Sequence, residues 1–352
     1  DALVATVGWA VDTYRHAPER FRAMQIASMS TAQVNAISTT ALSNIKGSQL
    51  AQLTTQQINA LTTSSLGSLT STQIVSLTTD QIVALSSTQA PKLSAQQIGA
   101  LSTTQVSKLG LDNLKMLSYD AIEALSVSQA KVLSSTQVGA LTSSQFRHLS
   151  TGVIAALASD RIVNLTNDQV AAITTDQVQA LTTSQVSNLS SAQLQKLTTS
   201  AVASLSALQI KAIDSAAVGS LTTDQVKAIK VEALGGMSST QISQLVATTQ
   251  IKALTTAQIN ALDSAQLKAL SETQMSNLSN AQIEAINAFQ VKGIDSADLN
   301  GLTTDQMRAF STAAIGSMSA ADQIAKLSST QIGALTSSQA KALTVAQAAA
   351  IT

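Results

Sequence analysis

A large apolar side chain returns at every eighth position along most of this chain. The stretch from Leu165 to Leu197 shows the repeat: an anchor, two small residues that are mostly Ser or Thr, a variable residue, Gln, and then Val or Leu. Counted from the anchor as position 1, Gln stands at position 5 and the second apolar residue at position 6. A fixed short period indicates an array in which every repeat forms the same small structural element.

The anchors are Leu, Ile, Met or Phe throughout the array, and they fall into three runs, which are Phe21–Leu245, Leu254–Met318 and Leu327–Ile351. Within each run the spacing is eight residues, and one extra residue separates each run from the next. No Gly- or Pro-rich linker interrupts the array. The pattern therefore predicts one continuous octapeptide-repeat solenoid over residues 21–352, with register shifts near 246–254 and 319–327.

The period predicts a short helix in every repeat. An α-helix turns about 100° per residue, so an eight-residue stripe would wind around an unbroken helix instead of facing one core. The sequence supplies a break after each anchor, where Ser or Thr at position 2 is followed three residues later by Gln, as in Thr174 and Gln177. This spacing is typical of a capping box at a helix start. We expect helices of six or seven residues, with position 6 and the next anchor on one buried face.

Charged residues follow the direction of these expected helices. Acidic residues stand at position 4, in the first turn, at Asp80, Asp120, Asp160, Asp168, Asp176, Asp224 and Asp305, and at the cap itself at Asp214, Asp263 and Asp295. Basic residues stand at position 7 or 8, at Lys92, Lys108, Lys196, Lys211, Lys227, Lys252, Lys268, Lys292, Lys326 and Lys341. Negative charge at the start and positive charge at the end complement the helix dipole.

Helices this short are unstable in water and persist only when they stack on neighbours. The predicted fold class is therefore all-α, a solenoid of very short helices with one helix per octapeptide. Ala recurs at position 8 in Ala36, Ala60 and Ala84, a first hint of superhelical turns of 24 residues, whereas the later spacing of Ala is irregular. The alternative is a β-solenoid, in which Thr, Val and Ile would line flat faces, although the Gly and Asn turn residues of such coils are scarce here.

Residues 1–20 do not follow the repeat. This segment contains the one Trp of the chain, Trp9, together with Tyr14, His16 and Pro18. Repeat arrays need an atypical end that covers their last apolar face. We expect residues 1–20 to form an N-terminal cap or a junction segment.

Composition and charge exclude several classes of function. Twenty basic residues balance twenty acidic ones, so no electrostatic field attracts nucleic acid. Cysteine is absent, which excludes disulfides and thiolate metal sites. No apolar run approaches the roughly 20 residues of a membrane-spanning helix. Aromatic residues make up 2% of the chain, which lowers the expectation of a binding surface built on Trp and Tyr.

No residues have the spacing of a catalytic, cofactor-binding or metal site. His16 and His148 are far apart in the sequence, and Gly235–Gly236 belongs to no phosphate-binding motif. The Asp and Glu residues occupy cap and first-turn positions, where helix stability accounts for them. We therefore expect no enzyme activity, no cofactor and no metal.

Gln at position 5 is the polar feature that recurs most often. Capping explains it, because its side chain reaches back to the backbone N–H of the cap residue. A second interpretation is a ladder of stacked Gln side chains along one side of the solenoid, and the two interpretations are compatible.

The repeat, as in LTTDQVKAI at 221–229, resembles the degenerate LTTxQ arrays of very large exported bacterial proteins that are described as adhesin-like or surface-layer-like. The resemblance implies a secreted, extracellular or cell-surface protein of bacterial origin. The expected function is a non-enzymatic structural scaffold that associates with itself as a filament, sheath, surface layer or adhesin stalk. The alternative is a solenoid binding module for a protein or glycan partner at the cell surface.

Overall fold

The structure is a computed structural model, and it describes residues 26–351. The expected cap at residues 1–20 lies outside this range. The described residues form short helices joined by tight corners, and they contain no β-strand. The prediction of an all-α solenoid is confirmed, and the alternative of a β-solenoid is wrong.

The chain divides into two compact units, Asp1–Ala172 and Ile173–Thr352. The helices described in the first unit are α3 (Thr31–Asn35), α4 (Thr39–Ser43), α5 (Gly47–Leu50), α6 (Thr55–Ala60), α7 (Thr63–Gly67), α8 (Ser71–Val75), α9 (Thr79–Val83), η2 (Ala90–Lys92), α10 (Ala95–Ala100), α11 (Thr103–Lys108), α12 (Leu111–Met116), α13 (Tyr119–Glu123), α14 (Val127–Val132), α15 (Ser135–Ala140), α16 (Ser143–Arg147), α17 (Thr151–Ala156), α18 (Ser159–Ile162) and α19 (Asn167–Ala172).

The second unit contains the same kind of element. Its described helices are α20 (Thr175–Ala180), α21 (Thr183–Ser187), α22 (Ser191–Lys196), α23 (Thr199–Ser204), α24 (Ala207–Ala212), α25 (Ser215–Val218), α26 (Thr223–Ala228), α27 (Val231–Leu234), α28 (Ser239–Ser243), η3 (Ala247–Ile251), α29 (Thr256–Ala261), α30 (Ser264–Lys268), α31 (Glu272–Ser276), α32 (Asn280–Glu284), η4 (Gln290–Gly293), α33 (Ser296–Asn300), α34 (Thr304–Ala309), α35 (Thr312–Ser317), η5 (Ile324–Lys326), α36 (Ser329–Ala334), α37 (Ser337–Lys341) and α38 (Val345–Ala349).

The α-helices are shorter than the sequence predicted. Those described have four to six residues, whereas the octapeptide pattern predicted six or seven. The anchor itself leaves the helix: Leu101, for example, has φ −54° and ψ 138° after α10. Because this extended residue turns the chain into the next cap, the helix ends at position 6, 7 or 8.

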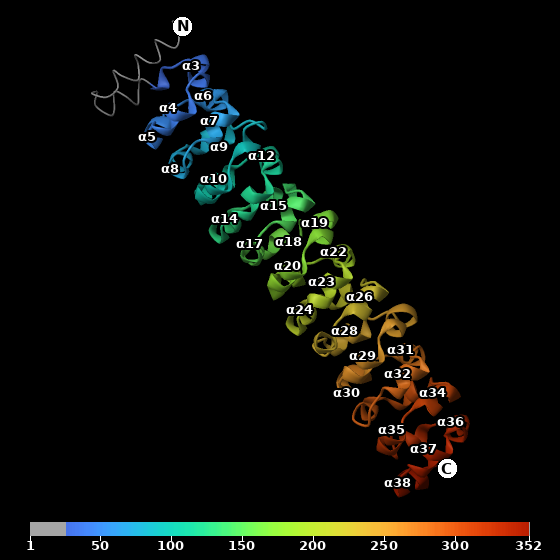
Figure 1. The fold of residues 1–352 in the computed structure, drawn as a ribbon. Helices are drawn as coiled ribbons and strands as arrows, with labels where there is room; N and C mark the ends of the chain where they lie inside the picture. Colours follow the sequence, from blue (N-terminus) through green and yellow to red (C-terminus); the bar gives the residue numbers. More distant parts are fainter. Residues whose placement is uncertain (1–25, 352) are drawn as a thin grey trace. The chain divides into compact units, whose positions relative to one another are not determined.

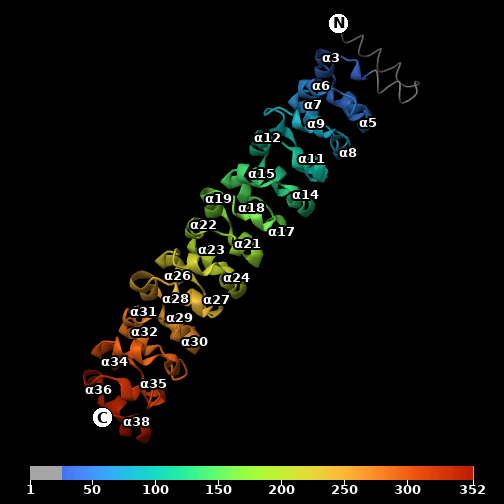
Figure 2. The same cartoon turned by 180° about the vertical axis from the view of Figure 1, so that it is seen from behind.

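Three helices complete one superhelical turn. In the first unit α9, α11, α14 and α17 stack in succession. The helix η2 lies between α9 and α10, so each of these four helices is the third after the one before it. Figure 2 shows α11, α14 and α17 following one another. In the second unit α21 packs on α24 and α24 on α27, and Figure 2 shows these three helices in that order. Figure 1 shows the same kind of short helix along the whole of this unit. A turn of three octapeptides contains 24 residues, as the spacing of Ala36, Ala60 and Ala84 indicated.

The core of each unit is a column of apolar, mostly aliphatic side chains from two repeat positions. Position 6 is at most 1% exposed from Ile58 to Ile324, and the anchors from Leu53 to Met318 are at most 5% exposed. Burial of an aliphatic side chain contributes about 1.5–3 kcal/mol. Over these repeats the apolar pattern of the sequence therefore forms the core.

Each of the two extra residues is absorbed by a wider helical turn. In η3, a π-helical turn, the N–H of Ile251 donates to the carbonyl of Val246, five residues earlier (3.1 Å). At the second extra residue the N–H of Ile324 donates to Ser319 in the same way (2.9 Å). The extra residue lies before Gln, so Gln and position 6 keep their places in the stack.

Candidate functional site: the glutamine rungs

Most buried position-5 glutamines join two consecutive turns of the solenoid. Gln97 is 1% exposed. Its Oε1 accepts from the backbone N–H of Ser94 (2.8 Å), and its own N–H donates to the Ser94 hydroxyl (3.2 Å). Its Nε2 donates to the carbonyls of Leu69 (2.7 Å) and Leu66 (3.0 Å) in the preceding turn. We call this set of bonds a glutamine rung.

The rung satisfies backbone groups at two helix ends with one side chain. The first N–H groups and last carbonyls of a helix have no partner inside it. Leu66 and Leu69 stand at the end of α7, and Ser94 caps the start of α10. A buried carbonyl left without a donor costs about 1–3 kcal/mol, so buried Gln at this position stabilises both turns.

The rung joins the same two repeat positions, position 5 and an anchor, in both units. Its Nε2 reaches the anchor carbonyl 28 residues earlier, as in Gln81 to Leu53 (2.6 Å) and Gln225 to Leu197 (2.7 Å). Across the first extra residue the separation becomes 29, as in Gln250 to Leu221 (2.6 Å). Gln at position 5 is at most 5% exposed from Gln57 to Gln347. The capping interpretation is confirmed. In the rungs described above Nε2 bonds to backbone carbonyls of the preceding turn, whereas a Gln ladder would join the side-chain amides to one another.

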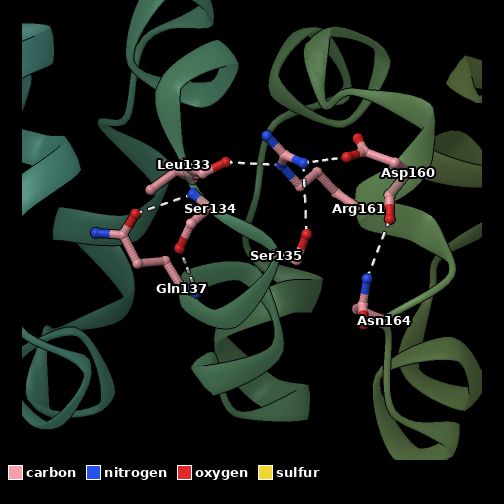
Figure 3. Close-up of polar contacts among 7 residues, drawn as sticks. All are labelled: Leu133, Ser134, Ser135, Gln137, Asp160, Arg161 and Asn164. Atoms are coloured by element: carbon pink, nitrogen blue, oxygen red, sulfur yellow. Dashed lines mark hydrogen bonds and ion pairs between the residues drawn. The ribbon is translucent and has the colours of Figure 1, made fainter.

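Arg161 replaces Gln in one repeat of the first unit and keeps half of the rung (Figure 3). Its Nε donates to the carbonyl of Leu133, 28 residues earlier (3.0 Å), and its Nη1 donates to Ser135 Oγ (3.4 Å) and pairs with the Asp160 carboxylate. Arginine has no acceptor, and Ala158 offers no hydroxyl at the cap. This repeat therefore lacks a capping box, and its helix α18 has four residues.

Asp298 occupies position 5 of another repeat and is 7% exposed. Burial, and then the negative charges of Asp295 and Glu272, raise the pKa of the Asp298 carboxyl, while a hydrogen bond from the backbone of Asp295 lowers it by less. Asp295 is the N-cap residue of this helix, but its carboxylate does not cap it and instead lies 3.6 Å from Lys268 Nζ. The role of Asp295 as a capping side chain was therefore predicted wrongly, whereas Asp214 and Asp263 do cap their helices.

The side chain of His148 contacts an aromatic ring and a backbone carbonyl. Its ring stacks on Tyr119, with centroids 4.4 Å apart and planes inclined by 4°. Its Nδ1 lies 2.7 Å from the carbonyl oxygen of Ser144 in its own helix. Tyr119 is at position 3 of its repeat, and His148 is at position 8 of a repeat in the next turn, 29 residues later. The same two positions contact each other elsewhere in the solenoid, and here both side chains are large. His16 lies outside the described residues.

The second glycine of the Gly235–Gly236 pair is explained by packing. A Cβ on Gly236 would lie 2.7 Å from that of Ala207, so glycine there permits a close approach of two turns.

Among residues 26–351, no three His, Asp or Glu side chains gather in a way that could hold a metal ion. The hollows on the described surface, such as the one beside Asn59 and Ala84, are open and shallow. No helix within the same range has the length and apolar character needed to cross a bilayer.

The double role of Gln was not recognised from the sequence. Its recurrence predicted the capping box, which uses only the Oε1 atom. The signal for the second role was the 24-residue turn. That spacing places each Gln beside the end of a helix in the preceding turn, about 28 residues earlier in the sequence.

Comparison with known families supports the repeat. A family model described as the ALTTAQ repeat matches residues 170–207, 246–280 and 291–337. No curated protein matches the chain. The matches confirm a degenerate repeat array, and two of them span the register shifts at 246–254 and 319–327.

Proposed function

We propose that this protein is a non-enzymatic structural scaffold that associates with itself outside the bacterial cell, as a filament, sheath, surface layer or adhesin stalk. The observation that carries the proposal is the direction of the rungs. Every turn offers Gln Nε2 donors on one side and anchor carbonyls on the other. A turn therefore complements the next turn, and the same complementarity operates between copies.

The surface available for such stacking contains aliphatic residues. In the last described turn Leu327, Leu335 and Leu343 are half-buried, whereas earlier anchors are at most 5% exposed. A contact of one end of the solenoid with the other end of a second copy is heterologous, and such contacts generate open polymers. The extracellular location is supported by the resemblance of the repeat to exported arrays.

Negative-stain microscopy and sedimentation velocity of the purified chain test self-association. We expect polymers or lattices whose abundance rises with concentration. Leu335→Glu combined with Leu343→Glu should reduce assembly, because it places charge on the stacking surface. Val83→Glu is the control, since Val83 is already 53% exposed on the outside of α9. Single particles at all concentrations would contradict the proposal.

A second candidate is a binding module, favoured by the exposed Tyr119. This ring is 49% exposed, and Met116 nearby in the sequence is 47% exposed. Exposed aromatic side chains serve as contacts for protein and glycan partners. A pulldown that yields one stoichiometric partner, lost with Tyr119→Ala, would favour this function over self-association.

A further inference from the structure

Asp298 stands at position 5, where the repeats on either side of it place a hydrogen-bond donor. The neighbouring Gln290 and Gln306 donate Nε2 to the anchor carbonyls of Leu262 (2.6 Å) and Leu278 (2.7 Å), each 28 residues earlier. The same register directs position 298 to the carbonyl of Leu270. An ionised carboxylate only accepts hydrogen bonds, whereas a protonated carboxyl also donates one.

The aspartate side chain is long enough for this contact. Asn113 occupies position 5 in the first unit, and its Nδ2 donates to the carbonyl of Leu85, 28 residues earlier, at 2.7 Å. The side chains of Asn and Asp have the same number of non-hydrogen atoms. A protonated Asp298 therefore has the reach to donate to Leu270.

The charged groups around Asp298 favour the protonated form. Asp295 lies at the start of the same helix, α33, and Glu272 comes from α31, which packs on α33. A Cβ on Gly301 would lie 2.7 Å from Glu272 Cγ, so the Glu272 side chain covers the end of α33. The Lys268 ammonium lies 3.6 Å from an Asp295 carboxylate oxygen and so partly offsets the charge of that residue.

We propose that Asp298 is a proton-dependent rung, which closes the contact between α33 and the turn anchored at Leu270 when its carboxyl is protonated and opens it when the proton is lost to water. This inference concerns the stability of one turn within the second unit. It goes beyond the proposed function and does not depend on self-association.

The direction of the pH effect follows from proton linkage. The folded-state pKa of Asp298 is raised above its ordinary value of 3.8, so the folded state binds more protons between the two values. The contribution of this rung to stability is fully present below pH 3.8 and is lost as the pH rises through the raised folded-state pKa. The local opening equilibrium changes about tenfold for each unit by which the pKa is raised.

Two measurements on the full chain test the rung. Carboxyl-carbon NMR titration, with the Asp298 signal assigned by its loss in Asp298→Asn, should give a midpoint above 3.8. Hydrogen exchange of residues 296–302, corrected for the intrinsic pH dependence of exchange, should show protection that falls as Asp298 ionises. In Asp298→Asn this step should vanish, and protection should stay at the level of the acidic wild type, because the amide donates at every pH.

Asp112→Asn is the control, since the Asp112 side chain is 92% exposed and its removal should leave the step at 296–302 unchanged. An Asp298 midpoint at or below 3.8 would overturn the proposal. So would a raised midpoint without any change in protection, because that result would describe a buried carboxyl that bonds to nothing in the preceding turn. If the pH-dependent step in protection persisted in Asp298→Asn, another group would cause it, and the proposed rung would be rejected.

Discussion

The side-chain nitrogen of Gln97 donates to the backbone carbonyl of Leu69 at 2.7 Å, from one superhelical turn to the preceding one. The oxygen of the same amide caps the start of its own helix. A single residue type therefore holds the helix start and the stacking of turns together. This explains why Gln recurs at position 5 more regularly than any charged residue recurs at its own position.

Helix α10 offers a matched pair of glutamines for testing the rung. Gln96 is exposed and Gln97 is buried in the same helix. We expect Gln97→Ala to lower the free energy of unfolding by about 1–3 kcal/mol, because buried carbonyls lose their donor, and to lower it further through loss of the cap. Gln96→Ala should be close to neutral. Urea unfolding monitored by circular dichroism measures both, and equal effects would contradict the rung.

The hydroxyl of Ser94 tests the cap separately. Ser94→Ala removes the bond from the Gln97 N–H but leaves the bonds of the Gln97 side chain in place. We expect a loss of about 1 kcal/mol, as at other N-caps, which is smaller than the loss from Gln97→Ala. The double variant should lose less than the sum of the two, because both residues form one capping box. Strict additivity in the same urea titrations would show that the two residues act independently.

Much of this fold could be predicted from the sequence because folding and repetition use the same residues. The anchors and position 6 define the core, and Thr174 with Gln177 shows the capping box that the structure contains. The bond of Gln Nε2 to the preceding turn could not be predicted, because it requires the stacking geometry. Asp298 and Arg161 were equally hidden, since each departs from the pattern and only its neighbours in space show what it replaces.

Two glycines should respond in opposite directions to the same substitution. Gly333 lies inside α36, and a Cβ there would meet nothing within 4 Å. Gly333→Ala should therefore raise stability by about 0.5–1 kcal/mol through helix propensity. Gly293→Ala should lower stability by about 1–3 kcal/mol, because its Cβ would clash with the Ser264 carbonyl oxygen. Thermal unfolding of both variants checks the signs, and a stabilising Gly293→Ala would refute the close approach of these turns.

Salt should change the stability of this protein little. The ion pairs Lys115–Asp112 and Arg308–Asp305 have side chains that are at least half exposed, and such pairs contribute about 0–1 kcal/mol each. Because stacking depends on apolar contacts and neutral rungs, we expect the unfolding temperature to be nearly the same at low and at moderate sodium chloride concentration. A large decrease with salt would show that electrostatic attraction stabilises the turns.

The extra residue in η3 should be removable, whereas a residue of an ordinary repeat should not. Deletion of Ala247 restores an octapeptide and lets Gln250 accept from Val246 at a normal spacing of three residues, while its partners Val218 and Leu221 remain in reach. We expect unchanged or higher stability, because a π-helical turn becomes an α-helical one.

Deletion of Thr240, in the neighbouring helix α28, is the matched comparison. It shortens that repeat to seven residues and rotates Gln241 and Ile242 by about 100°. Their buried positions in the stack are then lost, and unfolding should occur at a much lower urea concentration than in the wild type. If the two deletions had equal effects, the register of Gln and position 6 would not be what aligns consecutive turns.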